Sequence, residues 1–169
     1  MKQRAFTLME LMIVIVIIGI LSAVGMVMFG GQAEKAKIAV SKTNYKSIIS
    51  LINNTLVMCA FETSIKLKKR DGTDNIVSCN KGTHDMAWDF GDHLRAAGVK
   101  NPYSGKPDIW LGGVPLKAGE MQITGWSDST SWFPPGESCP NNKPCFHIEV
   151  MLDDDSKNNL KKIIVDPRY

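Results

Sequence analysis

The sequence lacks the short motifs that identify common catalytic and nucleotide-binding sites. It has no glycine-rich phosphate loop, no HExxH, no GxSxG and no paired set of metal ligands. His84 and His93 stand nine positions apart, too far out of phase for one helical face, and His147 lies in an expected strand. We therefore expect no enzymatic activity, no cofactor and no metal site.

The net charge of the chain is also small. The formal net charge of +3 is too small to indicate nucleic acid or an anionic membrane as a partner. With 44% hydrophobic and 22% charged residues, the chain is not disordered as a whole. Its 169 residues suffice for one ordinary domain plus an appendage.

One segment has no charge at all. From Leu11 to Phe29 the chain carries no acidic or basic residue, and only Gly19, Ser22 and Gly25 dilute the apolar run. As a helix this segment would rise about 28 Å, close to the roughly 30 Å hydrocarbon core of a bilayer. We therefore expect it to enter a membrane, whereas the rest of the chain has the composition of a soluble protein.

The four cysteines contain no CxxC pair. An even number without such a pair favours disulfides in an oxidising compartment over zinc or redox chemistry, with buried free thiols as the alternative. Of three possible pairings, Cys59–Cys79 and Cys139–Cys145 are favoured, because each closes a short local loop. The longer loop would stabilise the fold by on the order of 3 kcal/mol. Residues after Phe29 are thus expected on the oxidising side of the membrane.

Three interpretations compete for the first thirty residues: a secretory signal peptide cut near Gly25, a plain anchor, or an anchor that is cut ahead of the apolar run and later leaves the bilayer. Glu10 separates them, because a carboxylate one turn into an apolar helix costs free energy unless it is paired or near the interface. Cutting after Ala5 would release the amine of Phe6 one helical turn from Glu10. In a stack of parallel helices, Glu10 could then meet the amine of a neighbouring copy.

The stretch from Arg4 to Leu21, RAFTLMELMIVIVIIGIL, resembles the prepilin-type N-terminal signal of type IV pilins and the pseudopilins of type II secretion. It combines a short basic leader, Phe6, Thr-Leu, and a lone Glu10 before an uninterrupted apolar helix. The resemblance implies a leader, residues 1–5, that prepilin peptidase removes, N-methylation of Phe6, and an assembly role for Glu10. It covers about the first 25 to 30 residues. Ala5 replaces the usual glycine, and the helix-breaking proline of many pilins is missing.

After the apolar run, the helix is expected to continue in amphipathic form over residues 32–61. Its apolar side chains recur at helical spacing at Ile38, Tyr45, Ile49, Ile52, Leu56 and Cys59. Both halves together would form a helix of roughly 55 residues, about 80 Å long. The chain then divides into a leader (1–5), an apolar helix (6–31), an amphipathic helix (32–61) and a head (62–169).

The fold class expected from this organisation is α+β, with the long helix packed on a small antiparallel sheet, as in pilins. Within the head, a helix is predicted over residues 85–97, with Gly98 as its stop. Strands are predicted over residues 120–124, 146–152 and 160–165.

A basic group falls in an expected loop, residues 62–78. Its members are Lys66, Lys68, Lys69 and Arg70. A patch that binds DNA or another surface is one interpretation, but a solvated loop edge is favoured, since no aromatic residues interleave the charges.

An acidic group joins the last two predicted strands. Its members are Asp153, Asp154 and Asp155. Calcium prefers oxygen ligands, but the EF-hand spacing is missing, so a polar hairpin turn is favoured over a calcium site.

The favoured function is a structural subunit, a major pilin of a type IV pilus-like filament. By the resemblance, it starts as a single-pass inner-membrane precursor with its head outside the cytoplasm and ends in an extracellular pilus or a periplasmic pseudopilus. The expected partners are copies of itself, prepilin peptidase and inner-membrane assembly machinery; DNA is not indicated. The alternatives are a type II secretion pseudopilin or minor pilin and, in another class, a secreted binding domain with an ordinary signal peptide.

Overall fold

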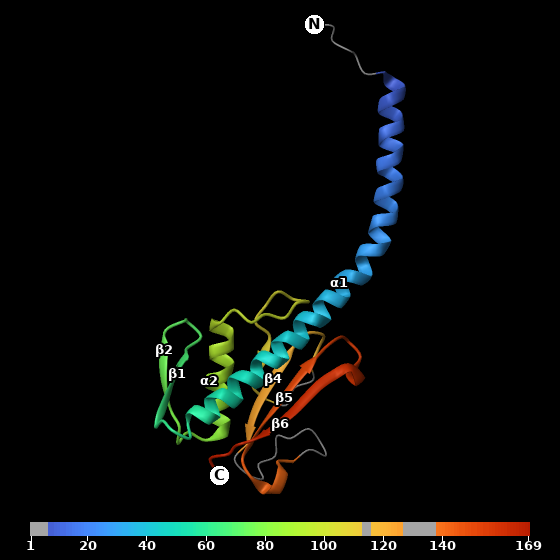
Figure 1. The fold of residues 1–169 in the computed structure, drawn as a ribbon. Helices are drawn as coiled ribbons and strands as arrows, with labels where there is room; N and C mark the ends of the chain where they lie inside the picture. The colour runs from blue at the N-terminus through green and yellow to red at the C-terminus, as the bar shows by residue number, and fades with distance from the viewer. Residues whose placement is uncertain (1–6, 113–115, 127–137) are drawn as a thin grey trace. The chain divides into compact units, whose positions relative to one another are not determined.

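The computed structural model describes residues 7–112, 116–126 and 138–169. One long helix, α1 (Leu8–Met58), runs through two compact units. The first unit is Met1–Ala36, and the second, here called the head unit, is Lys37–Tyr169. Figure 1 shows α1 and the elements that follow it.

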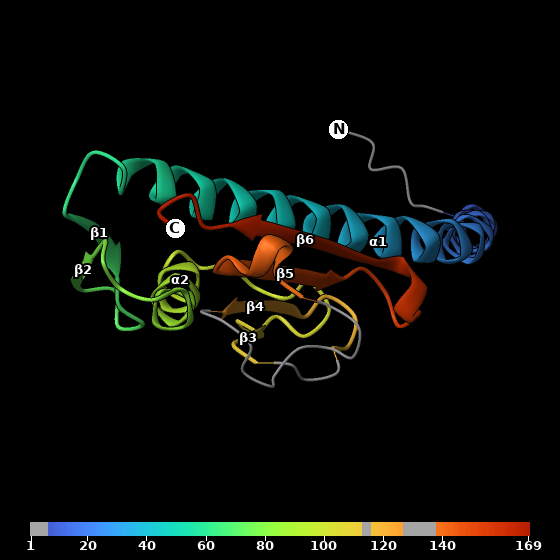
Figure 2. The ribbon, with the colours of Figure 1, turned by 90° about the horizontal axis from the view of Figure 1, so that it is seen from below.

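The head unit holds a hairpin, a second helix and a sheet. After α1 come β1 (Ser64–Lys68), β2 (Asp74–Ser78), α2 (Thr83–Ala96), β3 (Ile109–Trp110), β4 (Met121–Trp126), the 3₁₀ turn η1 (Pro140–Asn142), β5 (Cys145–Met151), the 3₁₀ turn η2 (Ser156–Asn158) and β6 (Asn159–Val165). Strands β1 and β2 form one antiparallel sheet, and the other four form a second sheet in the order β3-β4-β5-β6. Figure 2 shows this order, with β6 nearest α1. The α+β prediction is confirmed.

Two parts of the predicted topology were wrong. The segment expected to be a loop, residues 62–78, forms the β1–β2 hairpin, because Ile65, Leu67 and Val77 alternate with polar residues and reach the core. The larger sheet is also not purely antiparallel: β3, a strand of only two residues, pairs parallel to β4.

The predicted apolar stripe of α1 contains two of its three most buried residues, Ile52 and Leu56. The third, Ile48, was not predicted, and the predicted Tyr45 and Ile49 are only partly buried at the edge of the core. The predicted spacing was helical, but periodicity alone does not decide which of two adjacent isoleucines points at the sheet.

The core joins α1, the hairpin, α2 and the larger sheet. At its centre, the rings of Phe90 in α2 and Phe146 in β5 meet edge to face, with centroids 5.5 Å apart. Helix α2 ends where the sequence predicts, since Gly98 adopts φ +80°. Its amide donates to Arg95 O, and the amide of Val99 donates to Leu94 O, which satisfies the last carbonyls.

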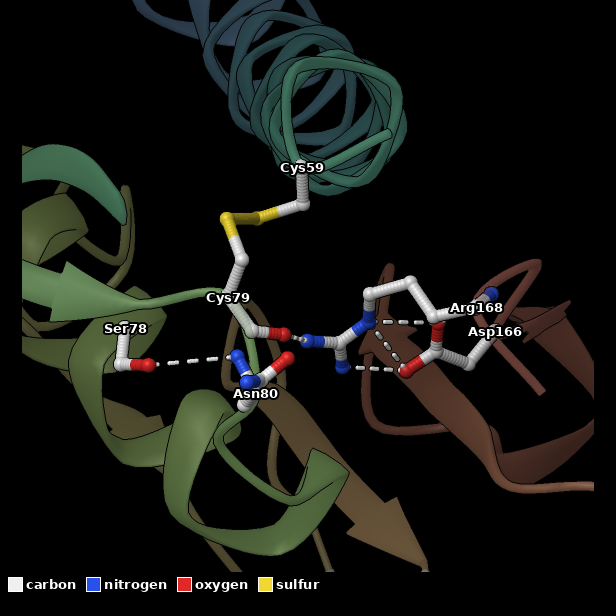
Figure 3. The surroundings of a disulfide bond; sticks show 6 residues. All are labelled: Cys59, Ser78, Cys79, Asn80, Asp166 and Arg168. Carbon is white, nitrogen blue, oxygen red and sulfur yellow. Dashed lines mark hydrogen bonds and ion pairs between the residues drawn. A yellow bond between two sulfur atoms is a disulfide. The ribbon is translucent and has the colours of Figure 1, made fainter. Parts of the chain in front are cut away.

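Two disulfides hold the ends of loops in the head unit. They join Cys59 to Cys79 and Cys139 to Cys145, the local pairing. The first ties the end of α1 to the residue that follows β2 (Figure 3). Helix α1 ends at Met58, three residues before its predicted end. The next residues form tighter turns, in which the amides of Ala60 and Phe61 donate to the carbonyls three residues before them.

Arg168 links the chain after β6 to this disulfide. Its guanidinium donates a hydrogen bond to the Cys79 carbonyl. It also donates to both carboxylate oxygens of Asp166, which lie 2.8 and 3.0 Å from Nε (Figure 3). Asp166 is fully buried, and this bonding raises the pKa of Arg168 above its ordinary value. The pair therefore fastens the last segment to the first disulfide loop.

Arg168→Ala should lower the free energy of unfolding by about 3 kcal/mol, because it leaves the Asp166 carboxylate buried and unpaired. We expect Lys66→Ala, which breaks an exposed ion pair with Asp74, to change it by less than about 1 kcal/mol. Urea unfolding of the full chain in detergent, followed by tryptophan fluorescence, measures both. Equal effects of the two substitutions would contradict the fastening role of Arg168.

Candidate functional site

The largest feature in need of a partner is the apolar part of α1. The window Leu8–Gly25 has a mean hydropathy of 2.6, none of it is buried, and it is long and apolar enough to cross a membrane. Its exposed side chains lie all around the helix, because consecutive positions such as Ile17 and Ile18 are each about half exposed. Such a surface is stable only in lipid or against other apolar surfaces.

Glu10 lies in a capping box at the start of this helix. The backbone N–H and the hydroxyl of Thr7 each donate to Glu10 Oε2 at 2.9 Å, and the Glu10 N–H donates back to Thr7 Oγ1 at 3.3 Å. The carboxylate therefore satisfies an otherwise unpaired amide and faces the positive end of the helix dipole. Thr7 was not predicted as a site residue, although its spacing from Glu10, T-x-x-E before an apolar run, is the signal of a capping box.

The predicted cleavage and methylation residues, Ala5 and Phe6, lie outside the described residues. The described chain begins directly after them, at Thr7. The distance between the Phe6 amine and Glu10 is therefore still an expectation from the sequence.

The predicted basic patch lies on the β1–β2 hairpin. Lys66 and Lys68 share one carboxylate, since both ammonium groups contact Asp74, with Lys66 Nζ 3.0 Å from Oδ2. These contacts, that of Lys68 first, lower the pKa of Asp74. Lys69 and Arg70 are exposed in the turn. Asp74 thus offsets one of the four positive charges of the patch.

The acidic turn, Asp153–Asp155, fixes its own backbone. Asp153 accepts the Asp155 N–H at 2.9 Å, and Asp155 accepts the Lys157 N–H at 3.0 Å. Within residues 7–112, 116–126 and 138–169, no group of three or more His, Cys, Asp or Glu side chains is arranged to hold a metal ion. The carboxylates here are structural parts of a turn, and Asp154 and Asp155 are exposed.

His93 fastens the hairpin to α2. Its Nδ1 accepts the backbone N–H of Lys68 at 2.9 Å, which requires the neutral ring with its proton on Nε2. Burial, and then the ammonium of Lys68, lower the pKa of His93. A second hydrogen bond joins the hairpin to α2, in which Asn75 Nδ2 donates to Asp89 Oδ1 at 3.0 Å.

A cavity of about 600 Å³ lies beside the first disulfide. Its walls include Glu62, Asn80 and Arg168. The Arg168 guanidinium is occupied by Asp166 and the Cys79 carbonyl, so it is held away from any anionic ligand. The cavity wall offers no nucleophile beside a base, and it supports no catalytic assignment.

Comparison with known families identifies the amino-terminal segment. Residues 1–26 match the family described as "Prokaryotic N-terminal methylation motif". The match supports a prepilin-type signal of the type IV pilins and pseudopilins, and with it a structural subunit of that kind that starts as a membrane-anchored precursor. Comparisons with curated proteins and with solved structures give no match.

The hydrogen bond to His93 predicts a pH-dependent head unit. Because the folded state lowers the pKa of His93, its contribution is complete above the unfolded pKa, near 6.5, and is lost as the pH falls below that value. We expect the urea midpoint of the full chain in detergent to fall between pH 7.5 and 5.5. In His93→Gln, whose amide oxygen can still accept the Lys68 N–H, this fall should be smaller. The same pH slope in both chains would rule out a contribution from His93.

Proposed function

We propose that the chain is the major subunit of a type IV pilus-like filament, assembled from an inner-membrane pool by bundling its apolar helices. The observation that carries the proposal is the match to the methylation motif on a helix whose apolar window is fully uncovered by its own chain. The same segment suits lipid before assembly and neighbouring copies after it. The alternatives that share the motif are a type II secretion pseudopilin and a minor pilin.

Burial of these helices supplies most of the cohesion in this proposal. At about 25 cal/mol per Å² of apolar surface, packing even part of the window among other copies gives a gross stabilisation on the order of tens of kcal/mol. The entropy of association reduces this value strongly. Because apolar burial has no direction, it brings helices together without choosing their stagger.

In this proposal, Glu10 sets the stagger between neighbouring helices. Its carboxylate is preformed at the helix start by Thr7, so that little ordering is needed when a cation approaches. After cleavage behind Ala5, the amine of Phe6 on a neighbouring copy is the cation expected there. The attraction between the carboxylate and that amine depends on how closely the two charges approach, so it favours the stagger that brings them together over others that bury the same apolar area.

Intact-mass analysis of the mature chain tests the processing step. We expect a polypeptide that begins at Phe6 and carries one added methyl group, because the resemblance to prepilin signals implies cleavage after Ala5 and methylation of Phe6; the match of residues 1–26 to a methylation motif supports this expectation. A start near Gly25 would instead identify an ordinary signal peptide and a secreted domain. Such a result would remove the apolar helix from the mature protein and contradict the filament proposal.

Glu10→Ala should leave membrane insertion intact and reduce the filaments sheared from cells by about tenfold, because the carboxylate that selects the neighbouring copy is gone. Glu10→Gln is the matched control, because its amide oxygen can still cap Thr7 while the charge is gone. If charge selects the neighbour, both variants lose filaments. Unchanged yield for Glu10→Ala would remove the assembly role, and loss for Glu10→Ala alone would assign it to capping.

A further inference from the structure

One face of the β1–β2 hairpin is uncovered in the chain. Ile65, Leu67 and Val77 point inward, and their neighbours alternate to the opposite face. On that outer face Ile76 is 74% exposed and stands directly across from Lys66. A large apolar side chain on a strand whose other face is fully packed leaves a flat surface that a partner can cover.

Four basic residues lie on the same hairpin as this isoleucine, and one of them, Lys66, is its cross-strand partner. We call the set the hairpin face; its members are Lys66, Lys68, Lys69, Arg70 and Ile76. The same hairpin contains two acidic residues, Asp71 and Asp74, so four cations and two anions leave a net charge of +2. The contacts from His93 and Asn75 to neighbouring elements hold the face in place before any partner arrives.

The acidic turn, Asp153–Asp155, carries the opposite charge. With Lys157 as the cation in the same connection, its net charge is −2. The turn is held by its own hydrogen bonds, and the Asp154 carboxylate also accepts the Ala118 N–H at 3.4 Å. Both charged surfaces are therefore preorganised.

The two surfaces lie at opposite ends of the head unit, as both views show (Figures 1 and 2). Their contacts agree with this placement. The hairpin base is tied by Cys79 to Cys59, at the end of α1. The turn follows Leu152, whose carbonyl accepts the hydroxyl of Tyr103, and the Tyr103 ring lies 4.8 Å from Lys37 Nζ, at the start of the helix within this unit. Between those points, α1 rises about 33 Å.

We propose that the hairpin face of one copy docks on the acidic turn of the next copy. Two different, complementary surfaces on opposite ends of one unit make a head-to-tail contact, which does not close into a two-fold pair and continues from copy to copy, as a ring or an open polymer. The inference rests on the proposed filament function, and it adds the surface through which the heads recognise each other. In a filament, the bundled helices hold the heads at high local concentration, so a modest contact is sufficient.

A second copy fits the hairpin face better than nucleic acid does. Ile76, which is 74% exposed, offers an apolar contact that a phosphate backbone cannot use. The hairpin sequence between Ser64 and Ser78 has no aromatic side chain on which a base could stack.

The test uses two charge-reversed full-length chains. The first carries Lys69→Glu and Arg70→Glu, which changes the net charge of the whole β1–β2 hairpin from +2 to −2. The second carries Asp154→Lys and Asp155→Asn; the asparagine keeps an oxygen that can accept the Lys157 N–H. A control chain carries Lys106→Glu and Lys162→Glu, two exposed lysines outside both surfaces, and matches the first chain in net charge. Sheared filaments are measured relative to the membrane pool of subunit.

Each reversed chain alone should give about tenfold fewer filaments, because like charges then meet at every contact, and the control should stay within about twofold of the natural chain. Produced together, the reversed chains should recover filaments in which they alternate, since each can bind only the other. Equal yields from the reversed and control chains, or no recovery on co-production, would overturn the docking contact.

These outcomes separate the two proposals. If the natural chain forms filaments and the charge reversals do not change the filament yield, the docking inference fails and the filament function stands. If the natural chain forms no filaments at all, both proposals are wrong. If the hairpin-reversed chain assembles normally but loses binding to a double-stranded DNA probe, the hairpin face serves DNA and the docking inference is overturned.

Discussion

An apolar helix that its own chain does not bury must be buried against lipid or other molecules, and the properties of this protein follow from that constraint. The window Leu8–Gly25 is exposed around its whole circumference, so folding of the head unit does nothing to shield it. Lipid and a bundle of like helices are the two environments that remove such a surface from water. In either environment apolar burial has no preferred direction, so polar groups are what can set the geometry of a contact.

The polar groups at the helix start and in the head unit are correspondingly well held. Thr7 fixes Glu10, His93 fixes the backbone of β1, and Arg168 fixes Asp166 against the carbonyl of Cys79. In each arrangement, side-chain hydrogen bonds fix the position of a helix end or loop that would otherwise fray. These hydrogen bonds therefore hold the helix start, the hairpin and the last segment in defined positions before any partner binds.

Some features of the head could be predicted because their causes are local. Gly98 ends α2 through a left-handed conformation, and alternation identified β5 and β6 to within one residue. The hairpin was missed because its strands are short and mostly polar, so their few apolar residues read as a loop. The parallel pairing of β3 could not have been found, since a two-residue strand carries no periodic signal.

The sequence alone determined the apolar helix, the processing motif and the α+β class, because run length, spacing and alternation are properties of neighbouring residues. Tertiary structure decided which isoleucine of α1 faces the sheet, that Asp166 is buried with Arg168, and that the basic hairpin and the acidic turn lie at opposite ends of the head unit. Those features depend on packing between residues far apart in the chain; Asp166 and Arg168 are near neighbours, but Arg168 also donates to the distant Cys79 carbonyl. Their positions follow from how the elements pack, which no local pattern encodes.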